Sequence, residues 1–258
     1  MSDARWPAVV TGAGRGIGRA IALELARRGH PVVLQARTRD QLEGTLAEIR
    51  DLGGRAALVP GDVRFPEASA GLVATCTEAF GPPAIAVAAA GRALSVPVLS
   101  TRPEDLTELF DVNVLGTFHL LVAAGRAMQE RKHGRFVAIA STAAVKPAKY
   151  IGAYAASKHA VVGLVRSAAI ELAPLGITVN AVCPGWVETS LLEDSLKNIA
   201  AKTGRSEDDA RSALRSRVPA GRFCSPEEVA SLVAYLVSDE ARHVTGQTLV
   251  IDGGESIA

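Results

Sequence analysis

The fold is decided by the stretch Thr11-Gly12-Ala13-Gly14-Arg15-Gly16-Ile17-Gly18. It follows the apolar run Ala8-Val9-Val10 and precedes a helical pattern at 17–28. Glycines at such a turn let the backbone bend tightly and approach a pyrophosphate, whose charge a helix N-terminus favours. The spacing G-x-G-x-x-G fails because position 17 is Ile, but Gly12, Gly16 and Gly18 fit G-x-x-x-G-x-G. Such turns also occur for packing alone, yet the order of strand, loop and helix favours phosphate binding.

Strand and helix patterns alternate outward from this turn to the end of the sequence. Strands are predicted at 8–11, 31–34, 55–59, 85–89, 135–140, 177–183 and 248–251. Helices are predicted at 17–28, 39–52, 66–80, 103–131, 154–172 and 226–237, with a partly helical stretch at 189–217. Continuous apolar strands indicate a parallel sheet buried on both faces. The pattern therefore predicts an α/β doubly wound Rossmann fold, with a seven-stranded parallel sheet between two helix layers in a single domain, 1–258.

Composition and charge exclude several kinds of partner. The 258 residues carry a formal net charge of +1, with Lys and Arg scattered along the chain, which argues against nucleic acid or an anionic membrane. The cysteines, Cys76, Cys183 and Cys224, lack metal-ligand spacing, so we expect reduced thiols, no metal and a cytoplasmic protein. No signal peptide is expected from residues 1–6, and no apolar run reaches the ~20 residues that a membrane span needs.

The end of the second predicted strand, Gln35-Ala36-Arg37-Thr38, indicates which dinucleotide binds. Folds that bind NAD usually place an acid here to hold the ribose 2′-hydroxyl, and an acid would repel a 2′-phosphate. No acid occurs before Asp40, whereas Arg37 and Arg15 are cations suited to phosphate. The cofactor is therefore predicted to be NADP(H) rather than NAD.

A tyrosine and a lysine one helical turn apart suggest acid–base chemistry. In Tyr154-Ala155-Ala156-Ser157-Lys158 the phenol and the ammonium share a helix face. A neighbouring cation stabilises the phenolate, so we expect the pKa of Tyr154 to be lowered. Such spacing is common on amphipathic helices, but Ser141-Thr142, directly after the predicted strand at 135–140, would place hydroxyls in the same crevice.

Together these residues resemble the short-chain dehydrogenase/reductase family, in particular the single-domain branch that includes β-ketoacyl-carrier-protein reductases and polyketide ketoreductases. The resemblance spans the whole chain and is specific because the motifs occur in order and at the spacing of the family. Besides the residues above, it is carried by Gly61-Asp62-Val63, Asn113 within Asp111-Val112-Asn113-Val114, Pro184-Gly185-Trp186-Val187-Glu188-Thr189, and Thr245-Gly246-Gln247 with Asp252-Gly253-Gly254.

The resemblance implies a catalytic role for four residues. Tyr154 would donate the proton in reduction, Lys158 would lower its pKa and bind the nicotinamide ribose, Ser141 would orient the substrate oxygen, and Asn113 would hold a water of a proton relay. The cofactor would be bound by Gly12, Arg15, Gly16, Ile17, Gly18, Arg37, Thr38, Asp62, Val63, Ala90, Gly91, Tyr154, Lys158, Pro184, Gly185, Val187 and Thr189.

One departure from the family lies after the fourth strand. The usual Asn-Asn-Ala-Gly is Ala88-Ala89-Ala90-Gly91 here, so we expect weaker polar anchoring of this strand end and unchanged chemistry.

The substrate cleft is expected to be formed by 92–96, 143–151 and a lid at about 186–217. Its predicted lining is mostly apolar and comprises Leu94, Ser95, Val145, Ile151, Trp186 and Leu191. The expected enzyme is an NADPH-dependent ketoreductase, or secondary-alcohol dehydrogenase, for an apolar ketone or a β-ketoacyl thioester. Alternatives are an NAD-dependent 3-hydroxy acid or cyclic alcohol dehydrogenase and, less favoured, a non-catalytic NADP-sensing protein. The resemblance also implies a homotetramer.

Overall fold

The computed structural model describes residues 6–146 and 148–258. The prediction that no signal peptide is present concerns residues 1–6, of which only Trp6 is among the described residues. Pro147, in the expected cleft segment 143–151, also lies outside the described residues.

Seven parallel strands form one sheet in the order β3-β2-β1-β4-β5-β6-β7, which confirms the predicted architecture. The strands are β1 Ala8–Thr11, β2 Val32–Ala36, β3 Ala56–Pro60, β4 Ile85–Ala88, β5 Gly134–Ile139, β6 Ile177–Pro184 and β7 Thr248–Ile251. The order reverses between β1 and β4, which is the point where the carboxyl ends of such a sheet leave a crevice for a ligand.

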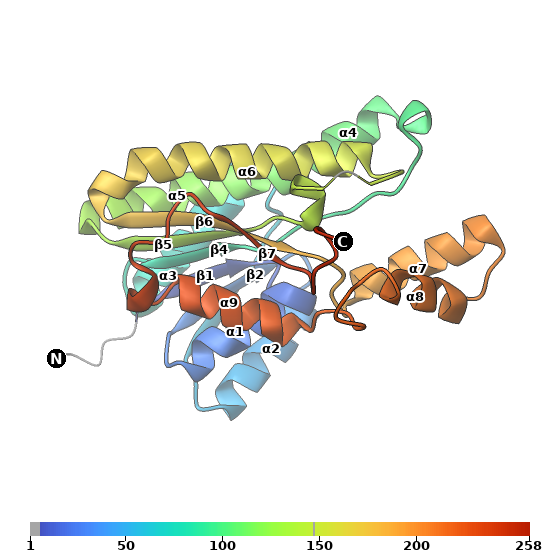
Figure 1. Ribbon diagram of the computed structural model, residues 1–258. Helices are drawn as coiled ribbons and strands as arrows, with labels where there is room; N and C mark the ends of the chain where they lie inside the picture. Colours follow the sequence, from blue (N-terminus) through green and yellow to red (C-terminus); the bar gives the residue numbers. More distant parts are fainter. Residues whose placement is uncertain (1–5, 147) are drawn as a thin grey trace.

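Two layers of helices cover the sheet (Figure 1). The helices are α1 Gly16–Arg27, α2 Arg39–Asp51, α3 Pro66–Phe80, α4 Pro103–Phe110, α5 Gly116–Arg131, α6 Gly152–Leu172, α7 Ser190–Thr203, α8 Glu207–Arg215 and α9 Pro226–Leu236. Helices α1, α2 and α9 lie on one face, and α3, α5 and α6 lie on the other. Helix α4 contacts α6, and the pair α7 and α8 projects from the edge of the body.

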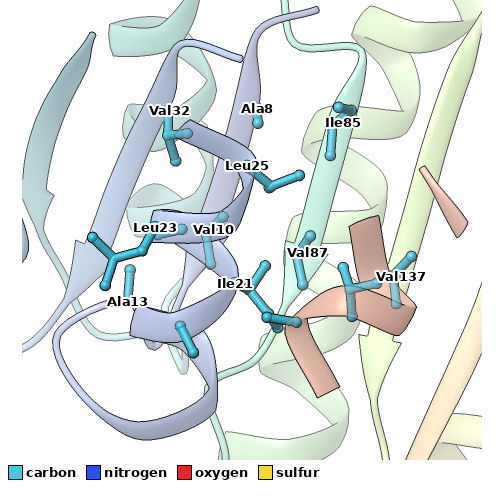
Figure 2. Close-up of a cluster of buried hydrophobic side chains, with 14 of the residues drawn as sticks. Ala8, Val10, Ala13, Ile21, Leu23, Leu25, Val32, Ile85, Val87 and Val137 are labelled. Carbon is cyan, nitrogen blue, oxygen red and sulfur yellow. The ribbon is translucent and has the colours of Figure 1, made fainter. Parts of the chain in front are cut away.

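The alternation of side chains along each strand divides the core into two clusters. Val10 and Val87 point toward α1, where Ile21 packs on them (Figure 2), whereas Val9 points to the opposite face. Both clusters consist of small and branched apolar side chains that are almost fully buried. A third, smaller cluster lies between α7 and α8 and has Leu196 at its centre.

The predicted helix at 103–131 is interrupted in the structure. A π-helical turn, Asp111–Leu115, separates α4 from α5, and the stretch as a whole remains helical. By length and composition this is the one helical stretch among the described residues that could cross a membrane. That is weak evidence, because helices of globular cores pass the same test, and α5 packs against α3 and the sheet.

Candidate active site

The glycine turn is shaped for a close approach of backbone. Gly12 and Gly16 have φ values of 68° and 55°, which side chains other than that of glycine rarely adopt. A Cβ on Gly12 would lie 2.7 Å from the amide N of Ala90, and one on Gly18 would collide with the carbonyl O of Gly12. At the start of α1 no side chain caps the backbone and no acid occurs in the first turn, so the positive end of the helix is available to an anion. The side chain of Ile17 packs on the core.

Three arginines lie in the segments that follow the first three strands, where the cofactor is predicted to bind. Arg15 is exposed before α1, and Arg37 is exposed with Thr38 after β2, as the sequence predicted. Sequence reasoning missed Arg64, whose guanidinium donates to Asp62 Oδ2 at 2.7 and 3.0 Å. These hydrogen bonds hold the pKa of Asp62 below its ordinary value, and a weaker attraction to Arg37 adds to the effect.

Helix α6 brings the predicted catalytic pair to the carboxyl end of β5. The Nζ of Lys158 donates a hydrogen bond to the carbonyl O of Ile139 at 2.9 Å and lies 5.9 Å from the centroid of the Tyr154 ring. Ser141 follows β5, and its Oγ accepts the N–H of Ala143 at 3.1 Å, which caps a short 3-10 turn. The three predicted residues therefore meet at one strand end.

The expected direction of the Tyr154 pKa is wrong for this structure. Burial raises the pKa of Tyr154, and a hydrogen bond to Ser141 opposes that rise without cancelling it. Burial also lowers the pKa of Lys158 to about 8, so the ammonium itself is destabilised by the low-dielectric surroundings that it shares with the phenol. Residue spacing predicted the neighbouring cation but not the desolvation of both groups.

Asn113 is fixed by the π-helical turn beside this pair. Its Nδ2 donates to Ser157 Oγ and to the carbonyl O of Arg92, each at 2.9 Å, and its Oδ1 accepts the N–H of Arg92. Ser157 in turn donates to the carbonyl O of Tyr154 at 2.7 Å. Sequence reasoning gave Ser157 no role, although its position three residues after Tyr154 places it one turn along α6. The relay water expected at Asn113 stays a prediction.

Gly91 lies close to Asn113 and Lys158, two of the predicted catalytic residues. A Cβ there would be 3.4 Å from Asn113 Oδ1 and 3.5 Å from Lys158 Nζ, so a larger residue would crowd both groups. The anchoring expected to be lost in the preceding alanines is partly restored, because Thr11 Oγ1 accepts the N–H groups of Ala89 at 3.2 Å and Ala90 at 3.3 Å.

The segment after β6 faces the glycine turn. A Cβ on Gly16 would lie 3.3 Å from Thr189 Cγ2, so the two ends of the predicted cofactor site are adjacent. Val187 is buried and forms an isolated parallel bridge with Cys224. Gly185 donates its N–H to the carbonyl O of Ile251 at 3.0 Å. Val63, another predicted cofactor residue, is also buried.

The predicted substrate residues differ in their contacts and in their exposure to solvent. Ser95 contacts α7, because the Nζ of Lys202 donates to its carbonyl O at 2.8 Å, and Val145 and Leu191 are about half exposed. Leu94 and Ile151 are partly buried in the loops before α4 and α6. Trp186 is partly buried and packs on the small cluster of α7 and α8, and its place in the cleft stays a prediction.

Comparisons with known proteins identify the class. A family model described as Enoyl-(Acyl carrier protein) reductase matches residues 12–256. With the glycine turn and the Tyr154–Lys158 helix in place, the chain belongs to the short-chain dehydrogenase/reductase family and is an oxidoreductase.

Its relatives include several proteins named as reductases. The chain is 37% identical to the short-chain reductase protein NovJ of Streptomyces niveus, over 96% of this chain and 92% of that protein. It is 35% identical to the 3-oxoacyl-(acyl-carrier-protein) reductase FabG of Vibrio cholerae, over 96% of each chain. A crystal structure of a variant actinorhodin polyketide ketoreductase with NADPH matches with a TM-score of 0.95 at 38% identity, over 98% of both chains.

Proposed function

We propose that this protein is an NADP(H)-dependent ketoreductase in which Tyr154 is the acid and base. One observation carries the proposal: Asn113 and Lys158 lie beside Gly91 at the carboxyl ends of β4 and β5, and Tyr154 contacts both Lys158 and Ser141 there. Similarity to a ketoreductase that was crystallised with NADPH supports the same reaction on a C=O or CH–OH group.

The residues present fit NADP(H). The turn at Gly12 and Gly16 leaves room that a Cβ would fill, and the start of α1 offers N–H groups with no competing acid. Arg37 and Arg15 are exposed where a 2′-phosphate would lie, and Arg64 neutralises the neighbouring Asp62. The uncharged Gln35 and Ala36 at the end of β2 leave no carboxylate to repel that phosphate.

The side chains then have defined tasks. When NADPH is bound, its nicotinamide supplies the hydride. Ser141 hydrogen-bonds the carbonyl oxygen of the ketone, and Tyr154, kept protonated by its raised pKa, delivers its proton to that oxygen. Lys158 stabilises the phenolate that remains, and Asn113 fixes α6 through Ser157. We further propose an apolar ketone or a β-ketoacyl thioester as substrate, with α7 and α8 as the lid.

Assembly and location follow the same proposal. We propose a cytoplasmic homotetramer, because large apolar side chains are exposed on α4, α5, α6 and β7, among them Phe118, Ile170 and Val250. Sedimentation at micromolar concentration would detect a species four times the 26.8 kDa of one chain.

The test is to follow NADPH and NADH oxidation with a panel of ketones and β-ketoacyl thioesters. Tyr154→Phe should lower kcat by roughly 100-fold or more while NADPH still binds, because the proton donor is removed and the ring is kept. The matched control is Tyr235→Phe on α9, which should keep full activity. An active Tyr154→Phe variant would remove this residue from the mechanism, and preference for NADH would overturn the cofactor.

A further inference from the structure

The segment 252–258, after β7, folds back over the carboxyl edge of the sheet. Asp252 fixes its turn, because Oδ1 accepts the N–H of Gly254 at 2.9 Å and Oδ2 accepts the N–H of Ser256 at 2.6 Å. Figure 1 shows the end of this segment above the sheet edge, beside the start of α6. We call residues 252–258 the C-terminal clasp.

The clasp contacts the lid where the lid returns to the body. Ala220 donates its N–H to the carbonyl O of Gly253 at 3.0 Å. A Cβ on Gly253 would lie 2.8 Å from Val218 Cγ1, and one on Gly254 would lie 3.2 Å from Pro219 Cγ. Both glycines have positive φ, so the clasp is shaped to pack tightly on the returning end of the lid.

The clasp also contacts the residue that begins the lid. Glu255 Oε1 accepts a hydrogen bond from Trp186 Nε1 at 3.1 Å. A Cβ on Gly185 would lie 2.8 Å from Asp252 Cβ and 3.2 Å from Glu255 Oε2, so the small residue before Trp186 makes this contact possible. The indole is thereby held between the carboxylate and the lid cluster.

A third contact reaches the loop between β5 and α6. Lys146, between Ser141 and Tyr154 in the sequence, donates from Nζ to the carbonyl O of Glu255 at 2.7 Å. The clasp therefore connects both ends of the lid with the loop between β5 and α6. Burial raises the pKa of Glu255, the Trp186 hydrogen bond opposes that rise, Asp252 adds to it, and the cations of Lys146 and Arg217 oppose it.

We propose that Glu255 is a positioning residue that fixes the Trp186 indole, and with it the start of the lid, so that the cleft is set for bulky ketones. The inference rests on the proposed ketoreductase function. Within the described part of the chain, Glu255 bonds to Trp186 and Lys146 and not to Tyr154 or Lys158, so its loss affects the fit of a large substrate and leaves proton transfer in place.

The experiment compares Glu255→Leu, Glu255→Gln and Trp186→Phe with a bicyclic ketone and with a ketone of four carbons. Glu255→Leu should raise KM for the bicyclic ketone roughly tenfold, the loss expected for a hydrogen bond to a charged group, with kcat and the small-ketone KM unchanged. Glu255→Gln keeps an acceptor for the indole N–H and should restore most of the affinity. Trp186→Phe should raise KM for the bicyclic ketone by a similar factor, and the double variant should be no worse than either.

Fluorescence gives a readout that is independent of turnover. Trp6 and Trp186 are the two tryptophans of the chain, so Trp6→Phe leaves Trp186 as the reporter. In that background Glu255→Leu should shift the emission to the red as the indole becomes hydrated, and Glu255→Gln should not.

Distinct outcomes separate failure of the inference from failure of the proposed function. Unchanged bicyclic-ketone KM and unchanged emission in Glu255→Leu overturn the inference, as do equal losses in Glu255→Gln and Glu255→Leu or additive losses in the double variant. If the unmodified protein reduces no ketone, the proposed function fails, and the fluorescence comparison still decides whether Glu255 fixes Trp186.

Discussion

Arg37 is exposed at the carboxyl end of β2, and no ion pair engages its guanidinium within residues 6–146 and 148–258. The nearby acid Asp62, which follows the carboxyl end of β3, is already paired with Arg64. Arg37 is therefore available for the phosphate that distinguishes NADP from NAD. Sequence alone identified this residue, because position after a strand and charge are both local properties.

Arg37→Asp should change the cofactor preference. A carboxylate repels the 2′-phosphate and accepts a hydrogen bond from a ribose hydroxyl, so the ratio of kcat/KM for NADPH to that for NADH should fall at least roughly tenfold. The control is Arg39→Asp, since Arg39 lies two residues away and pairs with Glu43 at 3.5 Å. An unchanged ratio in Arg37→Asp would transfer phosphate recognition to Arg15.

The lowered pKa of Lys158 leads to a prediction for the pH dependence of ketone reduction. Its pKa is lowered to about 8 by burial, so the ammonium is present below that pH and is lost as the pH rises through it. The kcat/KM for ketone reduction should fall above about pH 8, by up to tenfold per pH unit, because a neutral amine no longer stabilises the phenolate. Parallel measurement of NADPH affinity separates weaker binding from slower proton transfer, and a flat profile from pH 7 to 9.5 would contradict this role.

At the scale of elements, the glycine turn and the π-helical turn place the site. The glycine turn could be predicted from sequence because glycines with positive φ at a strand-to-helix junction are a local pattern. The π-helical turn at Asp111–Leu115 could not, because one added residue hardly alters the apolar periodicity of 103–131. It nevertheless sets the direction of Asn113 toward α6.

Gly12→Ala should destabilise the protein and abolish NADPH binding. The new Cβ would lie 2.7 Å from the Ala90 amide at a φ of 68°, which costs more than about 2 kcal/mol. Gly44→Ala is the matched control, since Gly44 is exposed within α2 with no atom within 4 Å of its added Cβ. That variant should gain about 0.5–1 kcal/mol, and thermal unfolding measures both. Equal melting temperatures for the two variants would refute the tight approach of the turn.

At the scale of the whole molecule, the body and the lid have separate apolar clusters. Each of the two body clusters extends over one face of the sheet, whereas the lid cluster is a small set of residues at α7 and α8. Small clusters with few layers above them are expected to open more readily than the sheet. We therefore expect α7 and α8 to move more readily than α6, which carries Tyr154 and Lys158.

Leu196→Ala and Leu25→Ala should have different consequences. Both leucines are fully buried, Leu196 in the lid and Leu25 on α1. Leu25→Ala should cost about 3 kcal/mol of global stability and lower Tm by roughly 6–12 °C. Leu196→Ala should leave Tm within a few degrees, increase hydrogen exchange in α7 and α8, and raise the ketone KM. A large fall in Tm for Leu196→Ala would show that lid and body unfold as one unit.

The sequence by itself determined the parallel sheet, the glycine turn and the preference for NADP(H), and it predicted the catalytic residues, because these depend on periodicity, local backbone conformation and residue type. Tertiary structure decided the pKa of Tyr154, the pairing of Asp62 with Arg64, the hydrogen bond from Asn113 to Ser157 and the contact of Glu255 with Trp186. Burial sums the surroundings from several elements, and a hydrogen bond such as that between Glu255 and Trp186 joins residues far apart in the chain. Neither is a property of a local stretch of sequence.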